Sequence, residues 1–194
     1  MDLSFAPYGV TGDADFVVAF SRRLNDLGLT ASAIGIVDRA LETDVPSARL
    51  DGARHRSGLS RLHCHRGELL RQAGELAAAE TSFRTALGLL EGGTTRAGRE
   101  GRAAVLNNLG LVHCERGDLS EAKRCLMASI EIDERLGTGR LELAVGFDNL
   151  GVIELRLAAA AGPRTARPPT SRAGRADEQA TTPSVHSVAE ACNS

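Results

Sequence analysis

An internal repeat limits the fold of this chain more than any other feature of its sequence. Residues 66–91 align with residues 109–134, which lie 43 residues further along the chain. The matched pairs are Gly67 and Gly110, Gly74 and Gly117, Ala79 and Ala122, Phe83 and Leu126, and Ala86 and Ser129. Repeats of about 20–50 residues are the signature of units that stack on one another. The chain is therefore predicted to be an array of similar units.

Within the better copy, the spacing of apolar and small residues is that of a helix pair. The first helix has a face made of Leu106, Leu109, Gly110 and His113, and the second has a face made of Ala122, Leu126 and Ser129. Spacings of i, i+3, i+4 and i+7 place residues on one side of a helix. Gly110 and Ala122 are small where the two helices should cross, so the backbones can approach closely. Leu126 and Phe83 are large where a neighbouring helix must be met.

The segment between the two helices carries signals for a turn. Gly74 and Gly117 stand where a residue in the left-handed region often ends a first helix. Asp118, with Glu121 three residues later, predicts an N-cap and its capping-box partner at the start of the second helix.

Two further copies are less complete. A third first helix is expected over about 141–160, where Gly151 lies 41 residues beyond Gly110, but no convincing second helix follows it. An earlier copy keeps the spacing at Gly28, Ala33, Val37 and Ala40, although it has Ser21 at the crossing position. Arg66 also stands where Leu is usual. We therefore predict an all-α fold, an α-solenoid of antiparallel helix pairs with about three to four partial or complete repeats.

The best copy, LNNLGLVHCERGDLSEAKRCLMASIEI at 106–132, resembles the tetratricopeptide repeat. The unit here is longer than the usual ~34 residues, and the extra residues, GGTTRAGREG at 92–101, are expected to form a loop between units. Long units of this kind resemble those of kinesin light chain and of bacterial regulatory arrays.

The composition changes after the array. Residues 162–194 hold four of the six prolines, many Ser, Thr and Arg, and few large apolar residues. Such a segment cannot bury enough apolar surface to offset the entropy of ordering it. We predict an N-terminal extension at 1–14, a helical repeat domain at 15–161 and a disordered tail at 162–194.

Charge and composition argue against several kinds of partner. The formal net charge is −2 and the sequence pI is about 6.2, so there is no basic field for nucleic acid or an anionic membrane. No apolar run is long enough for a membrane span, and the N-terminus lacks the pattern of a secretory signal. The four cysteines lack a CxxC spacing and are typical of reduced thiols, which favours a cytoplasmic location.

The resemblance implies where a ligand would bind. In tetratricopeptide arrays the first helices line a concave groove that holds an extended peptide or a partner helix. The positions that carry over are Asn107, Leu111, Cys114, Asp148, Arg71 and Arg156. An amide such as that of Asn107 can both donate and accept hydrogen bonds, whereas the two arginines suit a ligand carboxylate. The alternative is that these are ordinary surface residues.

No catalytic or metal site is predicted. His63, Cys64 and His65 point about 100° apart on a helix, so they cannot converge on one ion, and His113 and Cys114 do not face each other for the same reason. No phosphate loop, nucleophile elbow or zinc-protease motif is present. The chain is therefore expected to be a non-enzymatic protein without a cofactor.

These features favour a scaffold that binds a peptide or helix of another protein. Because the last first helix has no second helix to cover it, self-association or a partner is expected there. The alternative function is a sensor fragment of a bacterial signalling or transcription regulator that acts on an output domain in trans.

Overall fold

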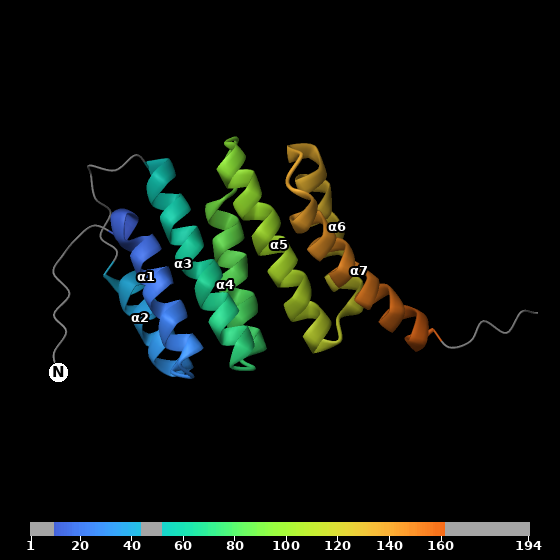
Figure 1. Cartoon of the computed structure of the whole chain (residues 1–194), viewed down its shortest axis with the longest axis horizontal. Helices are drawn as coiled ribbons and strands as arrows, with labels where there is room; N and C mark the ends of the chain where they lie inside the picture. The colour runs from blue at the N-terminus through green and yellow to red at the C-terminus, as the bar shows by residue number, and fades with distance from the viewer. Residues whose placement is uncertain (1–9, 44–51, 162–194) are drawn as a thin grey trace, which may run out of the picture. The chain divides into compact units, whose positions relative to one another are not determined.

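The computed structural model describes residues 10–43 and 52–161, which form seven α-helices and no strand (Figure 1). The helices are α1 (Val10–Asp26), α2 (Thr30–Glu42), α3 (Gly52–Gln72), α4 (Leu76–Leu89), α5 (Arg96–Arg116), α6 (Leu119–Leu136) and α7 (Arg140–Ala160). The predicted all-α class is confirmed.

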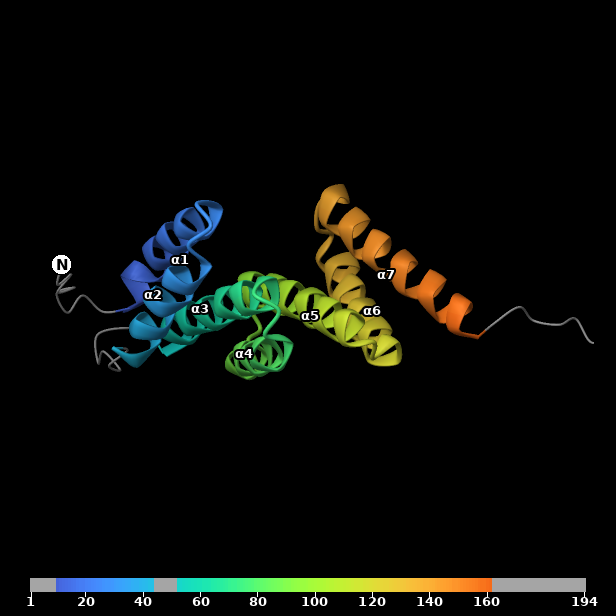
Figure 2. The ribbon, with the colours of Figure 1, turned by 90° about the horizontal axis from the view of Figure 1, so that it is seen from below.

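The helices pack as successive antiparallel pairs. Helix α1 packs on α2, α3 on α4 and α5 on α6, and each pair meets the next through α2 with α3, α4 with α5 and α6 with α7. The first helices also touch one another in the order α1, α3, α5, α7. Figure 2 shows α4 on one side of α3 and α5. This arrangement is an α-solenoid of helix pairs, as the repeat predicts.

The small residues lie where the paired helices cross. A Cβ atom on Gly67 would lie 2.8 Å from the ring of Phe83, and one on Gly110 would lie 2.9 Å from Cγ of Leu126. Real Cβ atoms do not approach other atoms that closely, so each crossing requires glycine. The predicted close approach is confirmed, and the large partner comes from the second helix of the same unit.

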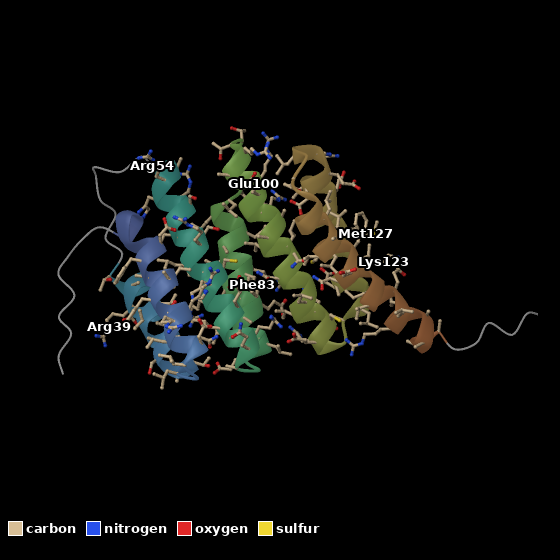
Figure 3. The ribbon with its side chains drawn as sticks, in the orientation of Figure 1. Arg39, Arg54, Phe83, Glu100, Lys123 and Met127 are labelled. Carbon is tan, nitrogen blue, oxygen red and sulfur yellow. The ribbon has the colours of Figure 1, made fainter. Side chains whose placement is uncertain are left out.

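The core runs along the array as three clusters of buried side chains. Phe83, labelled in Figure 3, is fully buried in the central cluster together with Val105 and Leu109 of α5. Leu126 of α6 meets Ile153 of α7 in the C-terminal cluster. Each cluster thus joins one unit to the next, which is how stacked units obtain stability from their neighbours.

Ser21 and Arg66, the two residues that depart from the repeat pattern, both form polar contacts with neighbouring helices. Ser21 is buried on α1, and its hydroxyl lies 2.6 Å from Nε2 of His65 on α3. Arg66 donates from Nε to Asp38 of α2 at 2.5 Å and from Nη1 to Ser82 of α4 at 2.8 Å. The N-terminal copy therefore forms a true helix pair that packs on the next unit.

The turn between α5 and α6 differs in part from the prediction. Gly117 has φ +86°, and Gly74 at the equivalent turn has φ +81°, so the expected left-handed ends are confirmed. Asp118 occupies the N-cap position of α6, as predicted, but its side chain caps no backbone N–H, so the predicted capping box is wrong. Glu121 instead pairs with Arg124 one turn later.

The predicted loop at 92–101 is also partly wrong. Helix α5 begins at Arg96, so residues 96–101 are helical. The reason is local, since Oγ1 of Thr95 accepts a hydrogen bond from the backbone N–H of Gly98 at 3.1 Å and caps the helix. Arg96 and Glu100 then pair at 2.8 Å with the i, i+4 spacing that supports a helix.

The predicted tail at 162–194 and residues 1–9 of the predicted extension lie outside the described residues. Within residues 10–43 and 52–161, no helix has both the length and the apolar character needed to cross a bilayer. The predicted cytoplasmic location stays a prediction.

Candidate functional site

The predicted binding residues lie on three of the four first helices, which touch in succession. Arg71 lies on α3, Asn107, Leu111 and Cys114 lie on α5, and Asp148 and Arg156 lie on α7. Helix α4 packs on one side of α3 and α5 (Figure 2). The structure therefore places these residues on neighbouring helices, and their role in binding stays a prediction.

Hydrogen bonds between successive first helices join side chains that are about one repeat apart. The bonds are Asn25 to Gln72 at 2.7 Å, Asn108 to Glu68 at 3.1 Å, and Asn149 to Asn107 at 3.1 Å. Because each bond joins α1 to α3, α3 to α5 or α5 to α7, the series holds the register of neighbouring units. Part of the predicted binding face is thus already used by contacts within the chain.

Arg71 is one of the residues used in this way. Its Nη1 donates to Oε1 of Glu115 on α5 at 2.5 Å. Its Nε is buried and has no hydrogen-bond partner among the described residues. A ligand carboxylate at Arg71 would therefore compete with Glu115.

Cys114 and Arg156 contact each other. Nη1 of Arg156 lies 3.0 Å from Sγ of Cys114 and donates to its carbonyl oxygen at 3.1 Å. Cys114 is buried, at 9% exposure. The guanidinium therefore connects α7 to α5, and the thiol is covered rather than presented to a ligand.

Asn107 lines an open depression of about 590 Å³ where α5, α6 and α7 meet. Its lining residues are Arg96, Glu100, Ala104, Asn107, Ser129, Asp133, Thr138, Gly139, Val145 and Gly146. The side-chain oxygen Oδ1 of Asn107 accepts a hydrogen bond from Nδ2 of Asn149. The side-chain nitrogen Nδ2 of Asn107 has no partner among the described residues. The depression thus has one amide donor available to a ligand.

Leu111 and Asp148 lie on α5 and α7, two of the helices that line this depression, but they are not among its lining residues. Leu111 is half-buried one turn after Asn107, and Asp148 is exposed on α7. Val145 and Val152, on either side of Asp148 in the sequence, are large apolar side chains about half exposed to solvent. The spacing i, i+3 and i+7 places Val145, Asp148 and Val152 on one face of α7, and Val145 lines the depression together with Asn107.

Asn149 and Val145 belong to this site but were not predicted. The repeat spacing contains a signal for Asn149, because it lies 42 residues after Asn107 and first helices touch in register. Val145 gives no such signal, since its exposure depends on how α7 is rotated against α6.

The side chains around His63 do not form a shared site. His65 bonds to Ser21 and approaches Glu68, while Cys64 faces Glu68 and Asn108. Burial lowers the pKa of His63, with a further contribution from Arg66. Burial, followed by the charge of Glu68, raises the pKa of the Cys64 thiol to about 12. This thiol is therefore protonated at neutral pH, which disfavours nucleophilic chemistry.

Comparison with known families identifies one repeat. Residues 103–135 match the tetratricopeptide repeat, and this range covers most of α5 and nearly all of α6. No curated protein matches the chain. The chain therefore contains a tetratricopeptide repeat, whereas the expected likeness to kinesin light chain stays a prediction.

Proposed function

We propose that this repeat-containing chain is a non-catalytic interaction module that binds an extended peptide along α5 and α7, next to Asn107. One observation carries the proposal: Nδ2 of Asn107, which has no partner among the residues that the structure describes, lies in an open depression that is also lined by Val145. A matched tetratricopeptide repeat supports it, because repeats of this kind serve protein–protein interaction.

The chemistry of the depression suits a peptide backbone. Since Oδ1 of Asn107 is occupied by Asn149, the amide offers a donor that would bond to a peptide carbonyl. Backbone carbonyls occur in every sequence, so this bond fixes position without selecting a side chain. Val145 and Val152 would supply the apolar contact that selects for apolar residues in the peptide.

Charge favours a basic residue in the ligand. Asp148 is exposed on α7 and forms no ion pair among the described residues, and it lies between the two valines in the sequence. At the rim of the depression, Arg96 is already paired with Glu100 at 2.8 Å. The proposed ligand is therefore an extended segment with apolar residues and a Lys or Arg near Asp148.

Selection from a random-peptide phage library on the full chain tests this proposal. The enriched peptides are expected to combine apolar residues with a Lys or Arg, and Asn107→Ala should weaken their binding roughly fivefold, the equivalent of one hydrogen bond of about 1 kcal/mol. Asp148→Asn should reduce the preference for basic residues. Binding is measured by fluorescence anisotropy of labelled peptides.

The matched control is Met127→Ala, which removes an exposed side chain from α6 (Figure 3). It should leave peptide affinity unchanged. Peptides that bind equally well to Asn107→Ala, Asp148→Asn and the parent chain would place the binding site elsewhere.

A further inference from the structure

Three side chains at the turn between α5 and α6 bring together a nitrogen, an oxygen and a sulfur atom. His113 lies in the last turn of α5, and Glu121 and Cys125 lie four residues apart near the start of α6. Their ligand atoms all lie within 4.8 Å of one another. Residues at i and i+4 share a face of a helix, so Glu121 and Cys125 both face the imidazole across the turn.

The imidazole of His113 is buried and has no hydrogen-bond partner within the described part of the chain. Its side chain is 5% exposed, and neither ring nitrogen has a partner among the described residues. The nearest carboxylate oxygen, Oδ2 of Asp118, lies 3.8 Å from Nδ1, which is too far for a hydrogen bond. Buried polar groups are almost always satisfied, and this imidazole faces a thiol and a carboxylate, which are groups suited to bind an ion together with it.

The fold itself does not require these three residues. At the equivalent positions of the preceding unit, 43 residues earlier, stand Leu70, Ala78 and Ser82. Leu70 and Ser82 are buried there, and Ala78 is half-buried. The same helix crossing is therefore built with an apolar, a small and a hydroxyl side chain, and the set of metal-binding atoms is particular to one unit.

We propose that His113, Glu121 and Cys125 bind one zinc ion, with a fourth position open to water. Imidazole nitrogen, thiolate sulfur and carboxylate oxygen are the three donors that zinc uses in proteins, and three protein ligands with an open position form a complete set. On binding, the proton of the Cys125 thiol passes to solvent. The ion would join the end of α5 to the start of α6.

The site needs only small side-chain movements. Zinc bonds of about 2.0–2.3 Å place tetrahedral ligand atoms about 3.3–3.8 Å apart, so the longest separation must shorten by roughly 1 Å. Glu121 now pairs with the exposed Arg124 and would exchange that partner for the ion. An open depression lined by His113, Asp118 and Glu121, among others, gives an ion access from solvent.

Titration of the chelator-treated full chain with zinc chloride tests the proposal, with cobalt(II) chloride as a spectroscopic probe. One ion per chain is expected, together with a rise in the melting temperature and a near-ultraviolet thiolate-to-cobalt band. His113→Leu, Glu121→Ala and Cys125→Ser each introduce the residue that the preceding unit uses at that place. Each should fold, as circular dichroism will show, and should weaken zinc binding by about tenfold or more.

Cys64→Ser is the matched control, because Cys64 lies outside the set and should leave both the affinity and the cobalt band unchanged. A cobalt band that survives in Cys125→Ser would overturn the proposal. The proposal would also be overturned if the parent chain took up no stoichiometric zinc, or if all three variants bound zinc as tightly as the parent chain.

Discussion

The crossing of α3 with α4 and that of α5 with α6 each depend on one glycine. Gly67 and Gly110 lie under Phe83 and Leu126, with less than 3 Å between the side chain and the place of a Cβ atom. Gly151 occupies the corresponding position of α7 but has no atom within 4 Å of that place. The same residue type in the same repeat position therefore has opposite packing environments.

This contrast predicts opposite effects of the same substitution. Gly110→Ala should lower the free energy of unfolding by about 1–3 kcal/mol, because Leu126 and the carbonyl of Ala122 leave no room for a methyl group. Gly151→Ala should raise it by about 0.5–1 kcal/mol, since alanine is the better helix former where nothing obstructs it. Urea denaturation followed by circular dichroism measures both changes. Equal effects at the two positions would contradict the assigned crossing.

At another pair of equivalent positions, serine and alanine are interchanged between two units, and the hydrogen bond between the positions is kept. In the second unit, the hydroxyl of Ser60 on α3 donates to the carbonyl of Ala86 on α4 at 3.0 Å. In the third unit, Ser129 on α6 donates to the carbonyl of Ala103 on α5 at 2.7 Å. The serine and the alanine have exchanged helices between the two units, and the bond joins the same two places. Comparing Ala86 with Ser129 alone would miss this equivalence.

At the scale of elements, α7 differs from α5 although the two helices are equivalent in the repeat. Leu106 and Cys114 on α5 are buried, whereas their counterparts on α7, Phe147 and Leu155, are exposed. Leu155 is 73% exposed and Cys114 only 9%. No described helix packs on that face of α7. An apolar helix face left open in this way favours contact with another chain.

We therefore predict that the full chain self-associates through α7. The double variant Phe147→Asp/Leu155→Asp should reduce the association, because each change places a charge in the proposed contact. Sedimentation velocity over a range of concentrations measures the oligomeric state. Met127→Asp, which changes an exposed residue of α6, is the control and should leave association unchanged. A parent chain that stays monomeric at every concentration would refute the prediction.

At the scale of the whole helical unit, stability depends on contacts between successive pairs. Phe83 of α4 lies in a cluster with Val105 and Leu109 of α5, and its ring also covers Gly67 of α3. Asn149 and Asn107 then join the following pair. Residues 10–43 and 52–161 are thus linked by neighbour contacts, which favours cooperative unfolding.

Phe83→Ala should lower the free energy of unfolding by about 3–5 kcal/mol, since it removes a fully buried ring shared by two units. Hydrogen exchange should show that α3, α4 and α5 lose protection together. Thr85→Ala, on the exposed side of α4, is the control and should change stability little. If only α4 lost protection in Phe83→Ala, the units would be independent of one another.

Helix order, helix pairing and the glycine crossings could be predicted from the sequence because they depend on local patterns. A period of 3.6 residues assigns each apolar side chain to one face, and a fixed offset of 43 residues repeats Gly67 at Gly110. The start of α5 was missed because Thr95 caps it within a glycine-rich stretch. The hydrogen bond from Gly98 to Thr95 caps the helix there, although the glycine content of the segment favours a loop.

The partners of the polar side chains were decided only by the tertiary structure. Asn107 meets Asn149, Arg71 meets Glu115, and His113 faces Cys125 rather than Cys114 because of how each helix is rotated against its neighbours. Periodicity assigns a residue to a face, but a rotation of a few tens of degrees changes which atoms meet across it. The helical array could therefore be predicted from the sequence. The proposed peptide and zinc sites could be identified only from the tertiary structure, because they depend on how the helices pack.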